Sequence, residues 1–129
     1  MNVELQKKLV QRAPYMFKYD ASDNQSPIRY YGFEVGDGWF DLLKTLILEL
    51  KRLDTNQHLQ VVQVKEKFGT LRFYINPIEN TIYDAVMESI EKAEQISSIT
   101  CELCGKPGTI NNKGWISVRC PECRSKEKS

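Results

Sequence analysis

Histidine is nearly absent from this sequence, with His58 as its single example in 129 residues. Catalysis by a Ser–His or Cys–His pair, and a zinc centre with histidine ligands, would all depend on that one residue. The chain also has no phosphate-cradling glycine motif followed by lysine. We therefore do not expect an enzyme. Two alternatives stay open on residue type alone, namely a nuclease-like set of Asp37, Asp41 and Lys65 and an active site around Asp37 and His58.

Long apolar runs are also missing. The best candidate, residues 42–50, is interrupted by Lys44 and Glu49 and falls short of the roughly 20 residues that a spanning helix needs. The first eight residues lack the basic-then-apolar order of a secretory signal. These features predict a cytoplasmic protein without membrane contact. The net charge of only +1 gives no global field that would attract nucleic acid or a membrane.

The four cysteines form two C-x-x-C pairs separated by fifteen residues. This spacing is typical of a site in which four thiolates bind one zinc ion. The predicted ligands are Cys101, Cys104, Cys120 and Cys123. Four thiolates fill a tetrahedral shell and leave no position for water or substrate, so the predicted zinc is structural. Disulfides or a redox dithiol are the alternatives, and disulfides would require an oxidising compartment.

Apolar periodicity indicates three helices before the cysteines. A short one covers 3–12 and is stopped by Pro14. The strongest follows Gly36-Asp37-Gly38, with Asp37 as the expected cap. Its apolar face comprises Trp39, Leu42, Leu43, Leu46, Ile47, Leu50 and Leu53. A third is expected from Asn80 or Thr81, either of which could cap it, to Ser97. The two glycines around Asp37 indicate either a loop that needs positive φ or an anion-binding loop.

Between the second and third helices, residues 58–76 alternate with the period of strands. We expect an antiparallel hairpin with its turn at 66–69, where Gly69 supplies a positive φ. The alternation directs Val62, Val64, Leu71 and Phe73 toward the core and Gln63, Lys65, Arg72 and Tyr74 to the opposite face. That polar face could bind a phosphate, a nucleotide or an acidic protein segment, or could simply be solvated.

The predicted fold class is α+β, with two main helices packed on a β-hairpin and a C-terminal zinc ribbon held by the four cysteines. The predicted division is a body at 1–97 and a ribbon module at 98–129. Residues 97–100 are too few for a free linker, so the module should dock against the body. We expect a hairpin turn at 111–114 and a Trp115 that covers the module or packs it on the body. Unpaired sheet edges would permit a dimer without indicating one.

Two further segments could contribute a binding surface. Residues 20–27 have the composition of a loop. The aromatic residues around it are Tyr15, Phe17, Tyr19, Tyr30, Tyr31 and Phe33. They could either stack on a ligand or pin the loop to the core. Residues 98–129 carry a net charge of +3, against −2 for the rest of the chain. The basic side chains near the carboxyl terminus that could meet nucleic acid are Arg119, Arg124, Lys126 and Lys128.

Several motifs resemble those of a family of small proteins without an assigned activity, found in bacterial and phage or prophage genomes. They are Gly-Phe-Glu-x-Gly-Asp-Gly-Trp at 32–39, Val-Val-Gln-Val-Lys-Glu-Lys-Phe-Gly-Thr-Leu-Arg-Phe-Tyr at 61–74, Ala-Glu-x-x-Ser at 93–97 and Cys-Glu-x-Cys-Gly-x-Pro-Gly at 101–108. The resemblance covers about residues 30–123, and the segment 61–74 is its most specific part. It implies a small accessory protein of the kind that phages use to bind or inhibit a host component.

The combined expectation is a non-enzymatic, zinc-stabilised binding protein that acts on a host protein or a small phosphorylated ligand. A nucleic-acid-binding zinc ribbon is the alternative. The residues expected to meet the partner are Asp37, Trp39, Lys65, Lys67, Arg72 and Tyr74.

Overall fold

The structure is a computed structural model and describes residues 1–18, 26–111 and 114–127. The helices are α1 (Val3–Arg12), η1 (Pro14–Phe17), α2 (Pro27–Tyr31), η2 (Asp37–Trp39), α3 (Phe40–Leu53), α4 (Asn80–Ser97) and α5 (Pro121–Glu127). The strands are β1 (Phe33–Glu34), β2 (Val61–Lys67), β3 (Thr70–Ile75), β4 (Thr109–Asn111) and β5 (Ser117–Arg119). Within the described ranges, every helix is too short or too polar to cross a membrane.

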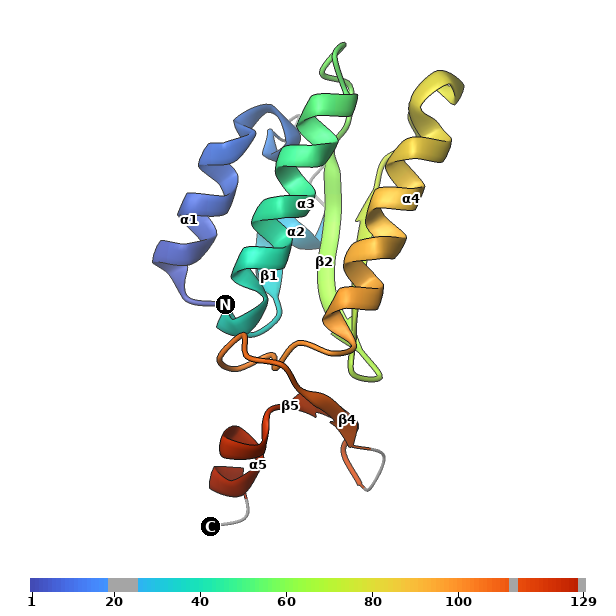
Figure 1. The fold of residues 1–129 in the computed structure, drawn as a ribbon. Helices are drawn as coiled ribbons and strands as arrows, with labels where there is room; N and C mark the ends of the chain where they lie inside the picture. The colour runs from blue at the N-terminus through green and yellow to red at the C-terminus, as the bar shows by residue number, and fades with distance from the viewer. Residues whose placement is uncertain (19–25, 112–113, 128–129) are drawn as a thin grey trace.

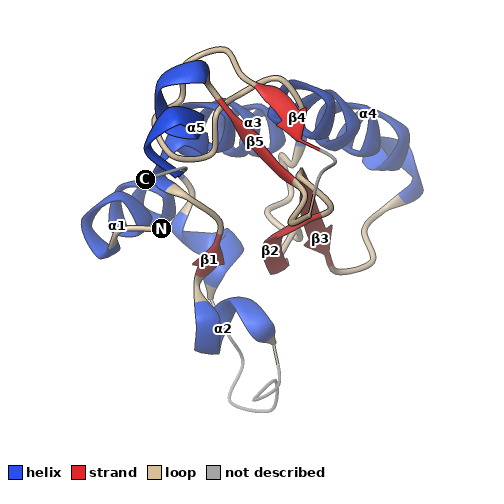
Figure 2. Cartoon of the chain, turned by 90° about the horizontal axis from the view of Figure 1, so that it is seen from below, coloured by secondary structure: helices blue, strands red, loops and turns tan. Residues whose placement is uncertain are grey.

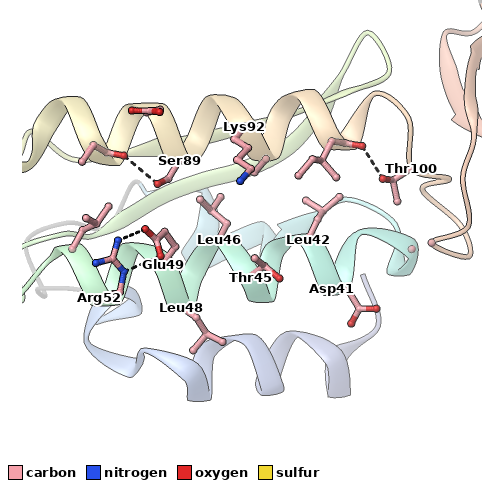
Figure 3. A pocket seen from close by; sticks show the side chains of 17 residues that line it. Asp41, Leu42, Thr45, Leu46, Leu48, Glu49, Arg52, Ser89, Lys92 and Thr100 are labelled. Carbon is pink, nitrogen blue, oxygen red and sulfur yellow. Dashed lines mark hydrogen bonds and ion pairs between the residues drawn. The ribbon is translucent and has the colours of Figure 1, made fainter.

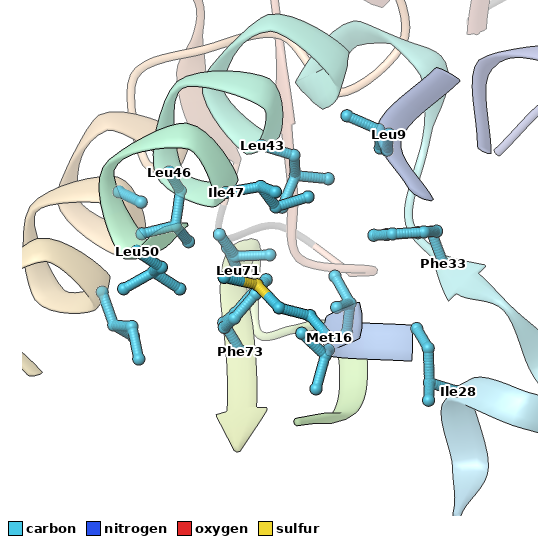
Figure 4. Packing of buried hydrophobic residues seen from close by; sticks show 14 of the residues in the cluster. Leu9, Met16, Ile28, Phe33, Leu43, Leu46, Ile47, Leu50, Leu71 and Phe73 are labelled. Carbon is cyan, nitrogen blue, oxygen red and sulfur yellow. The ribbon is translucent and has the colours of Figure 1, made fainter. Parts of the chain in front are cut away.

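The body has two layers. Helices α1, α3 and α4 lie side by side with α3 in the middle, and the sheet β1-β2-β3 lies behind them (Figure 1). Strand β1 is parallel to β2, and β3 is antiparallel to β2. Aliphatic and aromatic side chains from both layers fill the core between them (Figure 4). They include Leu9, Met16, Ile28, Phe33, Leu43, Leu46, Ile47, Leu50, Leu71 and Phe73.

The predicted helices are confirmed in position, but two of the predicted caps are wrong. Asn2 caps α1 by accepting from the backbone N–H groups of Glu4 and Leu5. Helix α3 begins after a 3₁₀ turn and has no side-chain cap. Asp37 accepts instead from the backbone N–H of Asn2 at 2.7 Å, because the N-terminal segment lies beside this turn. Helix α4 begins after Glu79 and also has no side-chain cap.

The hairpin and its turn are confirmed, with Gly69 at φ +84°. The core assignment of Val62 is wrong. A bulge between Val61 and Gln63 shifts the alternation, so Val61 is buried in its place. Val64, Leu71 and Phe73 are buried as expected.

Residues 15–35 are more regular than the sequence indicates, since they contain η1, α2 and the strand β1. The prediction of two helices on a two-stranded hairpin is therefore incomplete, because α1 and β1 also belong to the body. Tyr15 donates to Asp54 (2.7 Å), and Phe17 is buried against Phe33. Those rings pin the segment to the core, whereas Tyr30 and Tyr31 are exposed. Residues 19–25, most of the predicted loop, lie outside the described residues.

Helix α4 covers the outer edge of β3. The backbone N–H of Leu71 donates to Ser97 Oγ at 2.9 Å, and the carboxylate of Glu94 accepts a backbone hydrogen bond from Phe73. Burial raises the pKa of Glu94, and the bond from Phe73 partly opposes that rise. Because two edge amides are already bonded, this edge is a poor template for pairing with a second chain.

Replacing Ser97 by alanine should leave the Leu71 amide without its partner at a fully buried position. We expect a loss of about 1–3 kcal/mol in the free energy of unfolding, measured by chemical denaturation. Ser98→Ala is the matched control, because Ser98 bonds only to the carbonyl of Gln95 at the exposed end of the same helix. Equal stabilities for the two variants would show that the edge contact is not stabilising.

Candidate functional site

The four cysteines converge at one point in the segment that follows α4. Their Sγ atoms all lie within 4.8 Å of one another, and those of Cys104 and Cys120 are 3.5 Å apart. With metal–sulfur bonds of about 2.3 Å, a tetrahedral zinc–tetrathiolate centre has sulfur–sulfur edges of about 3.8 Å. The cluster therefore has the dimensions of a site for one metal ion. We call residues 98–127 the cysteine module.

The local backbone holds the sulfurs in this arrangement. The amide of Cys101 donates to the carbonyl of Lys106 (2.8 Å), and the amide of Gly105 donates to the carbonyl of Cys101 (2.9 Å). Gly105 adopts φ +83°, which closes the turn after Cys104. On the other side, the amide of Cys123 donates to the sulfur of Cys120 (3.4 Å) at the start of α5. Both C-x-x-C pairs thus form tight turns, as their spacing predicts.

The ionisation of the thiols also fits a cation site. Burial raises the pKa of Cys101, but backbone hydrogen bonds from Cys120, Cys104 and Leu103 outweigh it and hold this pKa at about 6. The pKa of Cys123 rises to about 12, first because of its hydrogen bond with the sulfur of Cys120. Crowded sulfurs cannot all ionise without a positive charge among them, and a divalent cation supplies that charge.

The cysteine module docks on the Gly36-Asp37-Gly38-Trp39 segment at the start of α3. The amide of Gly38 donates to the carbonyl of Glu102 (2.8 Å), and the indole N–H of Trp39 donates to the carbonyl of Thr100 (2.9 Å). Trp39 is 0% exposed, so its side chain is not available to a partner. Figure 1 shows the module beneath the amino end of α3 and the carboxyl end of α4.

Glu102 adds a polar anchor to this interface. Its carboxylate accepts from the amide of Gly36 at 2.9 Å and lies 3.7 Å from the guanidinium of Arg119. Burial raises the pKa of Glu102, while the bond from Gly36 lowers it. The sequence analysis missed Glu102 as a docking residue. The Gly-Asp-Gly-Trp motif could have indicated this interface, because its glycines leave room for a neighbouring backbone.

A second contact joins the module to the tip of the β2–β3 hairpin. A β-carbon placed on Gly69 would lie 3.2 Å from Cγ2 of Ile116, 3.6 Å from Cγ2 of Val118 and 3.7 Å from Cγ1 of Ile110. The strands β4 and β5 therefore meet the hairpin turn directly, as Figure 2 shows from below. The expectation that the module docks on the body agrees with both contacts.

The predicted polar face of the hairpin is present. Lys65 lies directly opposite Arg72, and Gln63 lies opposite Tyr74. The ammonium of Lys65 is 5.9 Å from the centre of the Tyr74 ring. Lys67 follows on the same face at the end of β2. Among the described residues, no carboxylate forms an ion pair with Lys65, Lys67 or Arg72.

The basic residues near the carboxyl terminus are partly engaged within the module. Arg119 lies against Glu102 and donates to the carbonyl of Val118, and Arg124 donates to the carbonyl of Thr109 at 2.7 Å. Lys126 is exposed, and Lys128 lies outside the described residues, as do Asn112 and Lys113 of the predicted turn. The expected role of Trp115 is wrong, because a side chain that is 83% exposed is not packed between the module and the body.

The residues of the two enzyme hypotheses are not brought together. Asp37 precedes the 14-residue helix α3 and His58 follows it, so the helix separates them by about 21 Å. His58 bonds through Nδ1 to Glu79 at 2.6 Å on the surface. Asp41 lies in the first turn of α3, whereas Lys65 lies on the far face of the sheet. No shared site results from either set.

A groove of about 1010 Å³ runs between α3 and α4 (Figure 3). Leu42 and Leu46 line its floor, and Ile96 and Ala93 line the α4 side. The charged groups Arg52 and Glu49 on its rim bond to each other at 2.5 Å. Its lining also includes the charged residues Asp41, Glu88 and Lys92, so the groove combines an apolar floor with charges of both signs.

Comparison with known proteins adds no further constraint, since no family model, curated protein or solved structure matches this chain.

Proposed function

We propose that the protein is a non-enzymatic binding protein with one structural zinc, and that its partner carries phosphate. The single observation that carries the proposal is the outer face of the hairpin. There Lys65 and Arg72 lie opposite each other without an ion-pair partner among the described residues, and Tyr74 lies beside them. The partner is a host protein or a small phosphorylated ligand, as expected for an accessory protein encoded by a phage or prophage.

Zinc is the metal that this donor set favours. Four thiolates at tetrahedral spacing suit zinc, whereas magnesium and calcium take oxygen ligands. Cys101, Cys104, Cys120 and Cys123 would hold it and leave no open position. The bound ion would supply folding free energy and no reaction chemistry.

The cations on the hairpin face are suited to phosphate. A guanidinium can bind phosphate in a bidentate manner, and an ammonium adds a point charge beside it. Lys65 and Arg72 are half-buried on the face of the sheet turned away from the helices α1, α3 and α4, while the short helix α2 contacts β2. Strand pairing fixes the backbone positions of these groups, so binding has only their side chains to order.

The zinc-loaded protein should bind to an immobilised polyanion such as heparin, and the double substitution Lys65→Gln/Arg72→Gln should lower the salt concentration needed for elution. The reason is that two charges are removed from one face without disturbing a buried group. The measurement is the elution position on a salt gradient.

The double substitution Lys8→Gln/Lys44→Gln is the control, since it removes the same charge from helices on the opposite side of the sheet. Equal shifts for the two double variants would mean that the retention reflects net charge alone, and the proposed face would then be abandoned.

A further inference from the structure

The hairpin turn contains an unusual residue. Phe68 has φ +55° and Gly69 has φ +84°, the pattern of a type I′ turn in which both central residues have positive φ. Asn, Asp and Gly are the residues that adopt this conformation at low cost, and a bulky aromatic residue there is strained. The chain therefore carries backbone strain at Phe68 that a different residue would remove.

Burial of the ring does not offset this strain, because the Phe68 side chain is 65% exposed. Gly69 makes the contact with the cysteine module, and the ammonium of Lys67 lies 5.6 Å from the centre of the Phe68 ring. Strained residues that the fold does not need are found at binding sites. The strain and the exposure together indicate that the Phe68 ring is available to a binding partner.

Phe68 belongs to a strip of alternating rings and cations. Tyr74 (43% exposed) lies at one end, followed by the opposed pair Lys65 and Arg72, then Lys67 and the Phe68 ring. Four residues of strand separate Tyr74 from the turn, which corresponds to about 14 Å. The strip therefore runs along the hairpin toward the cysteine module.

Trp115 extends the strip onto the module. Trp115 is exposed and precedes Ile116, whose Cγ2 would lie 3.2 Å from a β-carbon on Gly69, so the backbone of Trp115 is close to the hairpin turn. In Figure 1 the strands β4 and β5 lie below the tip of the β2–β3 hairpin. Without the metal that orders the module, this arrangement of rings would be lost.

We infer that this strip, formed by Tyr74, Lys65, Arg72, Lys67, Phe68 and Trp115, binds single-stranded nucleic acid. The inference rests on the part of the proposed function that gives the partner phosphate groups, and it assigns a nucleic acid in place of the host protein or small phosphorylated ligand. Successive bases stack on exposed aromatic rings, and the cations between the rings track the phosphates. A duplex keeps its bases stacked inside, so it cannot use the rings in this way. The described part of the module offers no long basic helix to a groove, since α5 has only seven residues and Arg124 bonds internally.

The test measures by fluorescence anisotropy how fluorescein-labelled oligothymidylate and oligouridylate bind to the zinc-loaded full chain. The oligonucleotides have about twelve nucleotides, a length within the site sizes of single-strand binders. Three contacting cations predict that log K falls with log salt at a slope of about −2. Phe68→Asn should raise the melting temperature by about 3–5 °C, because asparagine tolerates positive φ. The same variant should weaken oligonucleotide binding about tenfold or more.

Trp115→Ala should weaken binding to a similar degree without a change in melting temperature, since its side chain is largely exposed. Tyr83→Ala is the matched control, because Tyr83 is an exposed ring on α4, on the other side of the sheet. Its affinity should equal that of the wild type.

Equal affinity of the wild type and Phe68→Asn would overturn the inference, as would equal affinity for a duplex of the same length. Absence of oligonucleotide binding would also overturn it. If heparin retention still depended on Lys65 and Arg72, the proposed function would stand, and the partner would be a protein or a small phosphorylated ligand. Loss of both signals would reject the two together.

Discussion

Replacing Cys104 by serine is expected to abolish stoichiometric zinc binding and to unfold the cysteine module while the helices of the body remain. Structural zinc in small modules contributes on the order of 10 kcal/mol to folding, and a missing thiolate opens the closed shell. The secondary structure of the module is short, because β4 and β5 have three residues each and α5 has seven, so the metal has the largest part in ordering it. Metal analysis and an amide NMR spectrum measure the two effects together.

Leu103→Ala is the control for this experiment, since Leu103 is an exposed residue between the first two cysteines. It should retain one zinc per chain and a dispersed spectrum. Chelator treatment of the wild type should reproduce the spectrum of Cys104→Ser. A Cys104→Ser protein with one tightly bound zinc and an intact module would contradict the assignment of this residue as a ligand.

The second large effect is expected from Gly38→Ala. A β-carbon at this position would lie 2.2 Å from the carbonyl oxygen of Cys101 and 2.6 Å from the amide nitrogen of Gly105. Both atoms belong to the backbone of the cysteine turn, so no side chain can move to relieve the overlap. We expect a loss of about 3 kcal/mol in the free energy of unfolding, measured by denaturation. Trp39 emission should shift to the red as its indole loses the Thr100 carbonyl.

Gly114→Ala provides the comparison for that result. A β-carbon on Gly114 would meet no atom of the described residues within 4 Å, but the φ of +74° makes alanine unfavourable by about 1 kcal/mol. The difference between the two variants isolates the steric fit of the docking interface from backbone strain. If Gly38→Ala is no more destabilising than Gly114→Ala, the module does not need this close approach.

Local signals in the sequence predict much of the fold. The apolar periodicity locates α1, α3 and α4, and the alternation around Gly69 locates the hairpin. The cysteine spacing predicts a cluster that the structure brings together. In each case the pattern and the element lie in the same short stretch of chain, so elementary periodicity is sufficient.

The features that the sequence analysis missed depend on distant residues. Strand β1 has two residues and exists because it pairs with Val64 and Lys65. The bulge beside Val62 changes which residues of β2 face the core, so simple alternation gives the wrong face for Val62. Docking at Gly38 joins segments that are far apart in the sequence. Trp115 is exposed because the module packs on the body through a different surface. Periodicity carries no information on such pairings.

The fit between Gly38 and the cysteine turn has a consequence for comparative genomics. The two segments are steric complements, with the glycine on one side and the Cys101 carbonyl and Gly105 amide on the other. A related chain that loses the cysteine turn no longer needs glycine at position 38. A chain with a larger residue at position 38 cannot keep the same turn. Positions 36–39 and 100–105 should therefore be gained and lost together, as one heritable unit divided between two distant parts of the gene.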